Sequence, residues 1–176
     1  MSHDKPTRPQ NPDNQKDEDA IAFAQGLFEL ARNGGAGPLS VMLNAGVPVD
    51  IRTNTGDSLL MLACSNGHKD TARLLLEQGA DPNLANDQLQ TPLASAVYQG
   101  NTDIVDLLLT SGADVDHRPA DAKTPLMVAA MFNRVGIIER LLEAGADKSL
   151  KDEGGQSAED LARTMEANEA IGALSS

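Results

Sequence analysis

The stretch from residue 91 to residue 112 contains two short apolar stripes separated by polar positions. It reads TPLASAVYQGNTDIVDLLLTSG. Its Thr-Pro pair is typical of a helix start, because the hydroxyl can cap a free backbone N–H and proline tolerates the first helical position. A glycine then permits a tight reversal, and a leucine-rich stripe follows until Ser111 and Gly112 end it. The pattern predicts an αα-hairpin whose narrow apolar faces need further partners.

Copies of this hairpin recur at intervals of 33 residues. The position that caps the first helix is occupied by Ser58, Thr91, Thr124 and Ser157. The position that ends the second helix is occupied by Gly46, Gly79, Gly112 and Gly145. Asn133 shares the column of the reversal glycines Gly34, Gly67 and Gly100, and asparagine tolerates the left-handed backbone region better than most residues. Because several independent columns agree on one period, the sequence predicts a solenoid of stacked helical hairpins.

Three of the copies resemble the ankyrin repeat closely: SLLMLACSNGHKDTARLLLEQGADPN, TPLASAVYQGNTDIVDLLLTSGADVD and TPLMVAAMFNRVGIIERLLEAGADKS. The resemblance covers roughly residues 20–176, with degenerate ends. It implies an all-α fold, an ankyrin-repeat solenoid of helix-turn-helix hairpins joined by extended, β-hairpin-like fingers. We expect about five repeats, the first and last acting as caps, over residues 20–53, 54–86, 87–119, 120–152 and 153–176.

The two ends of the chain depart from the repeat. Residues 1–19 are mostly polar and lack apolar periodicity, so they bury too little surface to offset the entropy of ordering, and we expect a disordered tail. In the first copy Gln25, Gly26 and Leu27 stand where the other copies have their helix cap. Its apolar face is predicted to consist of Phe23, Phe28, Leu30, Val41, Met42 and Leu43.

The ankyrin resemblance also sets expectations for the fingers, whose tips usually turn at an Asp-x-x-Gly sequence. The fingers at residues 46–57 and 145–156 have a glycine at the tip. The finger at residues 79–90 has Leu89 there, and that at residues 112–123 has Ala122, with Pro119 in place of the aspartate. Neither Leu89 nor Ala122 adopts a positive φ without cost. We therefore expect these two tips to be atypical or more mobile.

The charge of the chain narrows the classes of partner that it could bind. The formal net charge is −12 and the sequence pI about 4.5, a balance that repels nucleic acid and anionic membranes. An acidic surface either keeps the protein in solution or attracts a basic partner. We expect a monomer that binds another protein, with no nucleic-acid or membrane partner. The chain shows no secretory signal, no membrane-length apolar run and no pair of cysteines, so the cytoplasm is the expected location.

Candidate catalytic or metal-binding groups are few. Cys64 stands where the repeat needs a small apolar residue, which predicts a buried, unreactive thiol. His117 with Asp114 and Asp116 could hold a metal, but a solvated finger explains the same residues. The glycine-rich segment at residues 33–38 follows a helix and lacks the Lys-Ser/Thr of a phosphate loop, so it is interpreted as a turn. We predict that the protein is not an enzyme and needs no cofactor.

The resemblance assigns binding to a concave surface formed by finger tips and the exposed ends of the first helices. The predicted protein-binding residues are Arg52, Asn54, Asp57, Asn66, Asp87, Gln88, Gln90, Tyr98, Gln99, Arg118, Asp121, Lys123, Met131 and Phe132. Tyr98, Met131 and Phe132 form the expected centre, because exposed apolar groups with a polar rim mark binding sites. Alternatively, Met131 and Phe132 tuck into the fourth repeat. A second hypothesis is a regulatory or inhibitory subunit that covers an enzyme, or shields a basic surface, through its acidic face.

Overall fold

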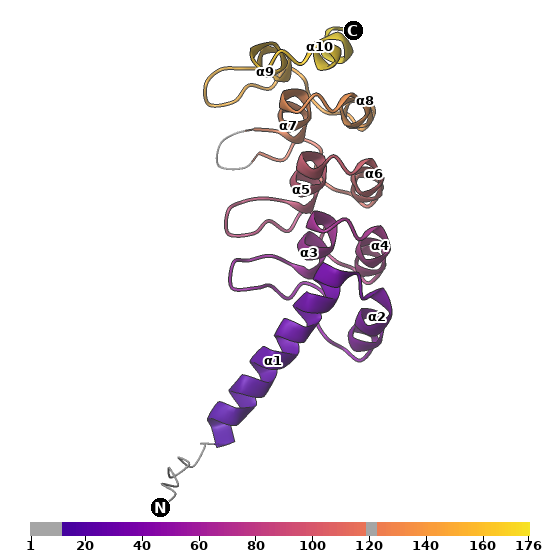
Figure 1. Cartoon of the computed structure of the whole chain (residues 1–176), viewed down its shortest axis with the longest axis vertical. Helices are drawn as coiled ribbons and strands as arrows, with labels where there is room; N and C mark the ends of the chain where they lie inside the picture. Colours follow the sequence, from indigo (N-terminus) through magenta and orange to yellow (C-terminus); the bar gives the residue numbers. More distant parts are fainter. Residues whose placement is uncertain (1–11, 119–122) are drawn as a thin grey trace, which may run out of the picture.

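The computed structural model describes residues 12–118 and 123–176, with side chains from residue 15 onward. Within these residues the chain folds into ten helices, which pair into hairpins and stack along one axis (Figure 1). They are α1 (Pro12–Asn33), α2 (Ala36–Asn44), α3 (Leu59–Ser65), α4 (Lys69–Glu77), α5 (Pro92–Gln99), α6 (Thr102–Thr110), α7 (Pro125–Met131), α8 (Val135–Glu143), α9 (Ala158–Thr164) and α10 (Asn168–Ser175). The first helix of each pair lies on the side of the fingers, and the second lies behind it. The predicted all-α solenoid is confirmed.

The predicted helix caps are present in all four copies. The side-chain oxygen of Ser58 accepts a hydrogen bond from the backbone N–H of Met61 at 3.0 Å. Thr91, Thr124 and Ser157 accept the equivalent bond three residues on, at 3.2, 3.3 and 3.2 Å. These bonds satisfy backbone donors that the helices leave free at their first turn. Each cap therefore fixes the point where a finger ends and a helix begins.

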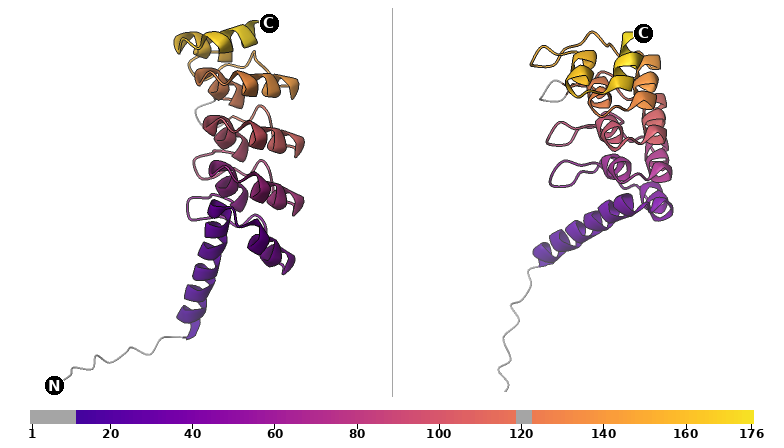
Figure 2. Two further views of the ribbon diagram at one scale, coloured as in Figure 1. Left: turned by 45° about the vertical axis from the view of Figure 1, so that its right-hand side comes forward. Right: turned by 45° about the horizontal axis from the view of Figure 1, so that its top comes forward.

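The first helix departs from the expected tail. α1 begins at Pro12 and runs for 22 residues, so residues 12–19 are helical where the sequence analysis expects disorder; residues 1–11 lie outside the described residues. The physical reason is at Gln25, where the other copies have their cap. Because no cap stops the helix there, it continues toward the N-terminus, and its first half leaves the stack (Figures 1 and 2).

The core is a continuous column of aliphatic side chains between successive hairpins. Leu75, Leu108 and Leu141 occupy one repeat position in three copies and are fully buried. Small residues such as Ala96 and Ala129 are also fully buried, which lets the first helices approach closely. The predicted face of the first copy is only partly correct. Phe28 and Leu43 are buried, whereas Phe23 is 49 % and Val41 65 % exposed, because the solenoid ends there and provides no further hairpin to cover them.

The reversals between paired helices use the left-handed backbone region. Asn133 was predicted to adopt the left-handed conformation in place of glycine, and its φ of 54° confirms this. Glu166 takes the same conformation one repeat later, with φ of 55°. Asn133 also stabilises the next repeat, because its Oδ1 accepts a hydrogen bond from the N–H of Ala170 at 3.0 Å. The reversal thus joins two hairpins as well as closing one.

The finger with Leu89 at its tip corrects the sequence-based expectation. Leu89 adopts a positive φ of 60° and donates to the carbonyl of Asn86 at 2.9 Å, as Gly56 does to Thr53 at 3.0 Å. The finger at residues 79–90 is therefore not atypical in its backbone. Of the second exceptional tip, Pro119 and Ala122 lie outside the described residues.

Neighbouring fingers are joined at their bases by a repeated hydrogen bond. The backbone N–H groups of Asp81, Asp114 and Asp147 each donate to a side-chain oxygen of the preceding finger, at Asp50, Asn83 and Asp116. Because the bond recurs at each step, the described fingers keep a constant register.

No helix in the described part of the chain combines the length and apolar character that a bilayer crossing needs.

Candidate protein-binding surface

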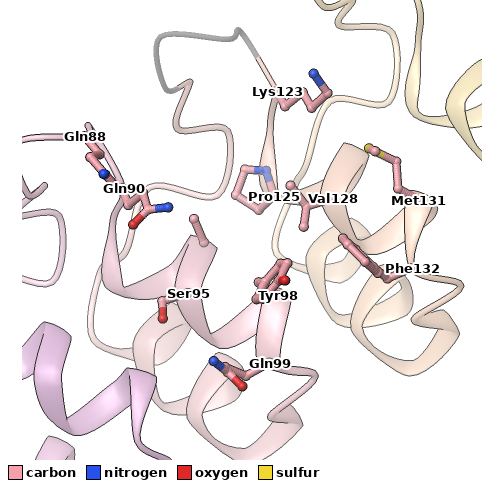
Figure 3. Close-up of a pocket in the computed structure, with 11 residues that line it drawn as sticks. Gln88, Gln90, Ser95, Tyr98, Gln99, Lys123, Pro125, Val128, Met131 and Phe132 are labelled. Carbon is pink, nitrogen blue, oxygen red and sulfur yellow. The ribbon is translucent and has the colours of Figure 1, made fainter.

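A cavity of about 660 Å³ opens between α5, α7 and the fingers that precede them (Figure 3). We call it the aromatic pocket, because Tyr98 and Phe132 form one of its walls. Its lining residues are Gln88, Gln90, Ala94, Ser95, Tyr98, Gln99, Lys123, Pro125, Val128, Met131 and Phe132. The two rings meet edge to face, with centroids 5.3 Å apart and an angle of 83° between their planes. Such pairs stabilise each other by about 0.5–1.5 kcal/mol beyond the area they bury.

The aromatic pair is open to solvent. Tyr98 is 58 % and Phe132 45 % exposed, although aromatic residues make up only 2 % of the chain. Phe132 therefore does not tuck into the fourth repeat, as one alternative proposed; Met131 is half-buried and packs against the core. Tyr98 lies in the last turn of α5 and Phe132 follows α7, so the stacking of two repeats places one ring against the other.

A second cavity, of about 480 Å³, adjoins the aromatic pocket, and we call it the polar pocket. It shares Gln88, Gln90 and Ser95 with the aromatic pocket. Its other lining residues are Asn54, Thr55, Asp57, Met61, Ser65, Asn86 and Asp87. The lining contains two carboxylates and no basic side chain. The polar pocket therefore suits a hydrogen-bond donor or a cation.

Asn86 organises the wall between these two pockets. Its side chain is 9 % exposed, and its Oδ1 accepts from the N–H groups of Gln88 and Gln90, both at 3.0 Å. Its Nδ2 donates to Asp57 Oδ1 of the preceding finger at 2.9 Å. The two glutamines that border both pockets are thus held by one buried amide.

A third cavity, of about 530 Å³, lies between α1 and the first finger, and we call it the α1 pocket. Its lining residues on α1 are Ile21, Ala24, Gln25, Phe28, Glu29 and Arg32, which share one helical face, and its finger residues are Thr53 and Asn54. Asn54 also lines the polar pocket. The polar pocket therefore adjoins both of the other pockets, and we call the row of three pockets the trough.

The predicted site residues divide into those that the structure gathers in the trough and those that it does not. The gathered residues are Asn54, Asp57, Asp87, Gln88, Gln90, Tyr98, Gln99, Lys123, Met131 and Phe132. Arg52 binds within the fingers instead: its guanidinium donates to the carbonyls of Gly56 and Ala85, at 3.0 and 2.8 Å. Asn66 donates to the carbonyl of Leu62 at the end of α3. Arg118 is exposed on the third finger, and Asp121 lies outside the described residues.

The contribution of α1 to this surface is not among the predictions from the sequence. Ile21 and Ala24 precede the first recognisable repeat position, so the 33-residue period assigns them no role. The signal was the spacing of Ile21, Ala24 and Phe28, which continues one helical face toward the N-terminus. That face brings these apolar side chains, together with Gln25, Glu29 and Arg32, to the first finger.

The side chains considered for catalysis or metal binding are either buried or make hydrogen bonds in the fingers. Burial raises the pKa of the Cys64 thiol to about 12, which confirms its predicted burial and keeps it protonated at neutral pH. His117 Nε2 lies 3.2 Å from the carbonyl oxygen of Leu89, and Asp116 Oδ1 accepts from the N–H of Asp147. Across the described residues, no three His, Cys, Asp or Glu side chains converge on a point where a metal ion would fit.

Comparison with known proteins agrees with the repeat architecture. A family model described as ankyrin repeats in three copies matches residues 27–119 and 90–152. The chain therefore belongs to the ankyrin repeat family, whose members serve as protein–protein interaction modules.

Individual relatives match over short segments. An ankyrin repeat protein of Pseudomonas aeruginosa is 44 % identical over 64 residues, which are 36 % of this chain and 37 % of that protein. The ankyrin repeat domain-containing protein 29 of Homo sapiens is 46 % identical over 63 residues, 35 % of this chain and 21 % of the relative. The protein phosphatase 1 regulatory subunit 27 of Mus musculus is 35 % identical over 66 residues, 38 % and 43 % of the two chains. The matched segment is less than half of each relative's length.

Proposed function

We propose that the protein binds a segment of a partner protein on its concave surface, with the aromatic pocket as the main contact. The observation that supports this most directly is the exposed pair of Tyr98 and Phe132 beside a cavity of about 660 Å³. Large aromatic side chains at the centre of a contact surface contribute much of the affinity of protein complexes. Their edge-to-face contact fixes both rings before binding, so less conformational entropy is lost when a partner is bound.

The surroundings of the aromatic pair support the same proposal. The pocket wall combines apolar side chains of α7 with the amides of Gln88, Gln90 and Gln99, which can donate and accept hydrogen bonds at once. An apolar centre with an adaptable polar rim is the usual anatomy of a protein contact surface. The rigid repeat stack keeps these groups at fixed spacing, and no side chain in the wall needs to perform chemistry.

The test is the affinity for a partner captured from the source cell by the full-length protein. Tyr98→Ala and Phe132→Ala should each weaken binding by about 2 kcal/mol, or roughly 30-fold. Because the two rings contact each other, the double variant should lose less than the sum of both. The matched control is Val41→Ala, which removes another exposed apolar side chain on the outer helix α2 and should leave affinity unchanged. A partner that binds the double variant as tightly as the wild type would place the contact elsewhere.

A second candidate function is that of a regulatory subunit that covers a basic surface of an enzyme. It is favoured by the net charge of −12 and by the similarity to a mouse protein named as a phosphatase regulatory subunit. Ionic strength separates the two candidates. Binding through long-range charge should weaken steeply between low and high salt, because exposed charges are screened, whereas binding through the aromatic pair should change little.

A further inference from the structure

The trough offers apolar side chains at both ends, beside polar and charged ones at the α1 end, and carboxylates in the middle. The aromatic pocket lies at one end, and the α1 pocket with Ile21, Ala24 and Phe28 lies at the other. Between them the polar pocket contributes Asp57 and Asp87. Because the polar pocket adjoins the pocket on either side, one bound chain that follows the row can contact all three. Along the trough, apolar side chains are thus available at each end and two carboxylates in the middle.

The spacing of the two apolar ends limits what can bind. Packed helices lie about 8–10 Å apart, and the trough extends from α1 past α3 to the edge of α5 and α7. Its apolar ends are thus about 20 Å apart on that helix spacing. An extended chain rises about 3.3 Å per residue and would cover this distance in about six residues.

The amides along the trough favour an extended segment over a helix. Gln88 and Gln90 border both of the neighbouring pockets, and Asn54 borders the polar and the α1 pocket. Each amide can pair with both a backbone N–H and a backbone carbonyl. An extended chain presents such groups unpaired, whereas an α-helix uses them internally.

Charge complementarity sets the central residue of the segment. The side chain of Asp87 is 64 % exposed, and its nearest cation, the guanidinium of Arg52, is 3.7 Å away. That guanidinium is itself bound to the carbonyls of Gly56 and Ala85. The Asp87 carboxylate is therefore open to a second cation approaching from the trough.

We infer that the trough recognises an extended protein segment with two apolar side chains about six residues apart and a basic side chain between them. The aromatic pocket binds one apolar side chain, the α1 pocket binds the other, and Asp87 pairs with the cation. This inference rests on the proposed function, since it uses the aromatic pocket as one of its ends. Beyond the aromatic pocket, the bound segment makes two further contacts, one in the α1 pocket and one with the carboxylate of Asp87.

The experiment selects a phage-displayed library of random peptides against the full chain and measures the selected peptides by fluorescence anisotropy. Enriched sequences should carry the apolar–basic–apolar order at the stated spacing. Ile21→Ser and Asp87→Asn should each weaken their binding by about tenfold. Phe23→Ser is the matched control for the first variant, because Phe23 is another exposed apolar residue of α1 but does not line the α1 pocket. Asp103→Asn on α6 is the control for the second, because it changes the net charge equally but lies in the second-helix layer, behind the first helices that line the trough.

A double-mutant cycle tests the charge pair itself. Replacing the basic residue of a selected peptide with glutamine should weaken binding to the wild type by about tenfold, but only slightly to Asp87→Asn. Peptides that respond to Tyr98→Ala but not to Ile21→Ser or Asp87→Asn would overturn this inference and leave the proposed function standing. If the selection yields no peptide that responds to Tyr98→Ala, both are contradicted.

Discussion

The fingers at residues 46–57 and 79–90 differ in sequence at their tips and yet close in the same way. In the first, Thr53 N–H donates to Asp57 O at 2.9 Å, and in the second, Asn86 N–H donates to Gln90 O at the same distance. The tip residue is Gly56 in one and Leu89 in the other, with φ of 82° and 60°. A leucine there costs about 1–2 kcal/mol in backbone strain, so the surrounding hydrogen bonds must outweigh its local preference.

The source of those bonds is the side chain three residues before the tip. In the first finger Thr53 Oγ1 accepts from the N–H groups of Thr55 and Asp57, at 3.3 and 3.1 Å. In the second finger Asn86 Oδ1 accepts the equivalent pair, and the last finger uses Asp152 in the same way. Threonine, asparagine and aspartate thus each form the same type of turn, in three different fingers. What the finger requires is an acceptor at this position, and the tip residue adapts to it.

The largest effect is expected from Asn86→Ala. This change leaves the N–H groups of Gln88 and Gln90 without their acceptor and breaks the bond to Asp57. Buried donors left unpaired cost about 1–3 kcal/mol each. Because these two N–H groups are only part-buried, we take the lower end for each and add the lost bond to Asp57, so the free energy of unfolding should fall by about 3 kcal/mol, as measured in urea. Thr53→Ala should cost less, since the hydrogen bonds of the Thr53 hydroxyl join it to Thr55 and Asp57 of its own finger. Equal losses in the two variants would contradict the central role of Asn86.

A smaller effect on stability is expected from replacing glycine at the finger tips, and it should differ between Gly56 and Gly155. A β-carbon on Gly56 would contact the Asp87 carboxylate and lie 2.8 Å from the backbone nitrogen of Asp87, whereas one on Gly155 would meet nothing within 4 Å. Both glycines have a positive φ. We expect Gly56→Ala to destabilise by about 2–3 kcal/mol, the sum of backbone strain and steric overlap. Gly155→Ala should cost only the strain, about 1 kcal/mol. Thermal unfolding of both variants measures the difference between their losses of stability. Similar losses would show that the contact between Gly56 and Asp87 rearranges at little energetic cost.

The repeat fold could be predicted almost completely from recurring residues. The cap of each first helix from α3 onward is a single Ser or Thr with a local partner, so the spacing of these residues was enough to place those helices. The length of α1 could not be predicted in this way, because it follows from a missing cap at Gln25 rather than from a positive signal. The conformation of the second finger also escaped prediction. It depends on the bonds that Asn86 Oδ1 accepts from the N–H groups of Gln88 and Gln90, which the tip residue alone does not reveal.

The candidate site could be predicted in part. Tyr98 and Met131 share one repeat column and Phe132 follows directly, so large side chains at those exposed positions were visible in the sequence. Their meeting in one wall required the stacking of two repeats, which the period implies. The position of Arg52 could not be foreseen, because its guanidinium reaches a carbonyl 33 residues away. The α1 pocket was hidden because it lies before the first full repeat.

Leu89→Gly tests the strain directly and should stabilise the protein. Glycine adopts φ of 60° without steric cost, so removing the leucine side chain should raise the free energy of unfolding by about 1 kcal/mol, less a part lost to the greater freedom of glycine in the unfolded chain. Leu89 is 47 % exposed, and little buried area is lost. Leu89→Ala keeps the strain and should show no gain. A loss of stability in Leu89→Gly would mean that the leucine contributes contacts that outweigh its strain.

The smallest effect concerns the junction between the last finger and α9, the only described junction with a carboxylate three residues after the cap. Asp160 accepts from the N–H of Ser157 at 2.9 Å, and this bond holds the pKa of Asp160 below its ordinary value. A lowered folded-state pKa adds stability above the unfolded pKa of about 4, and this stability is lost as pH falls through the folded value. In urea titrations at several pH values, Asp160→Asn should be slightly less stable than the wild type at pH 7, and the difference should disappear in acid. Ser157→Ala keeps the backbone donor, so most of the pH dependence should survive while the cap is lost. A difference between wild type and Asp160→Asn that stays constant across the titration would show that the bond contributes no charge-dependent stability.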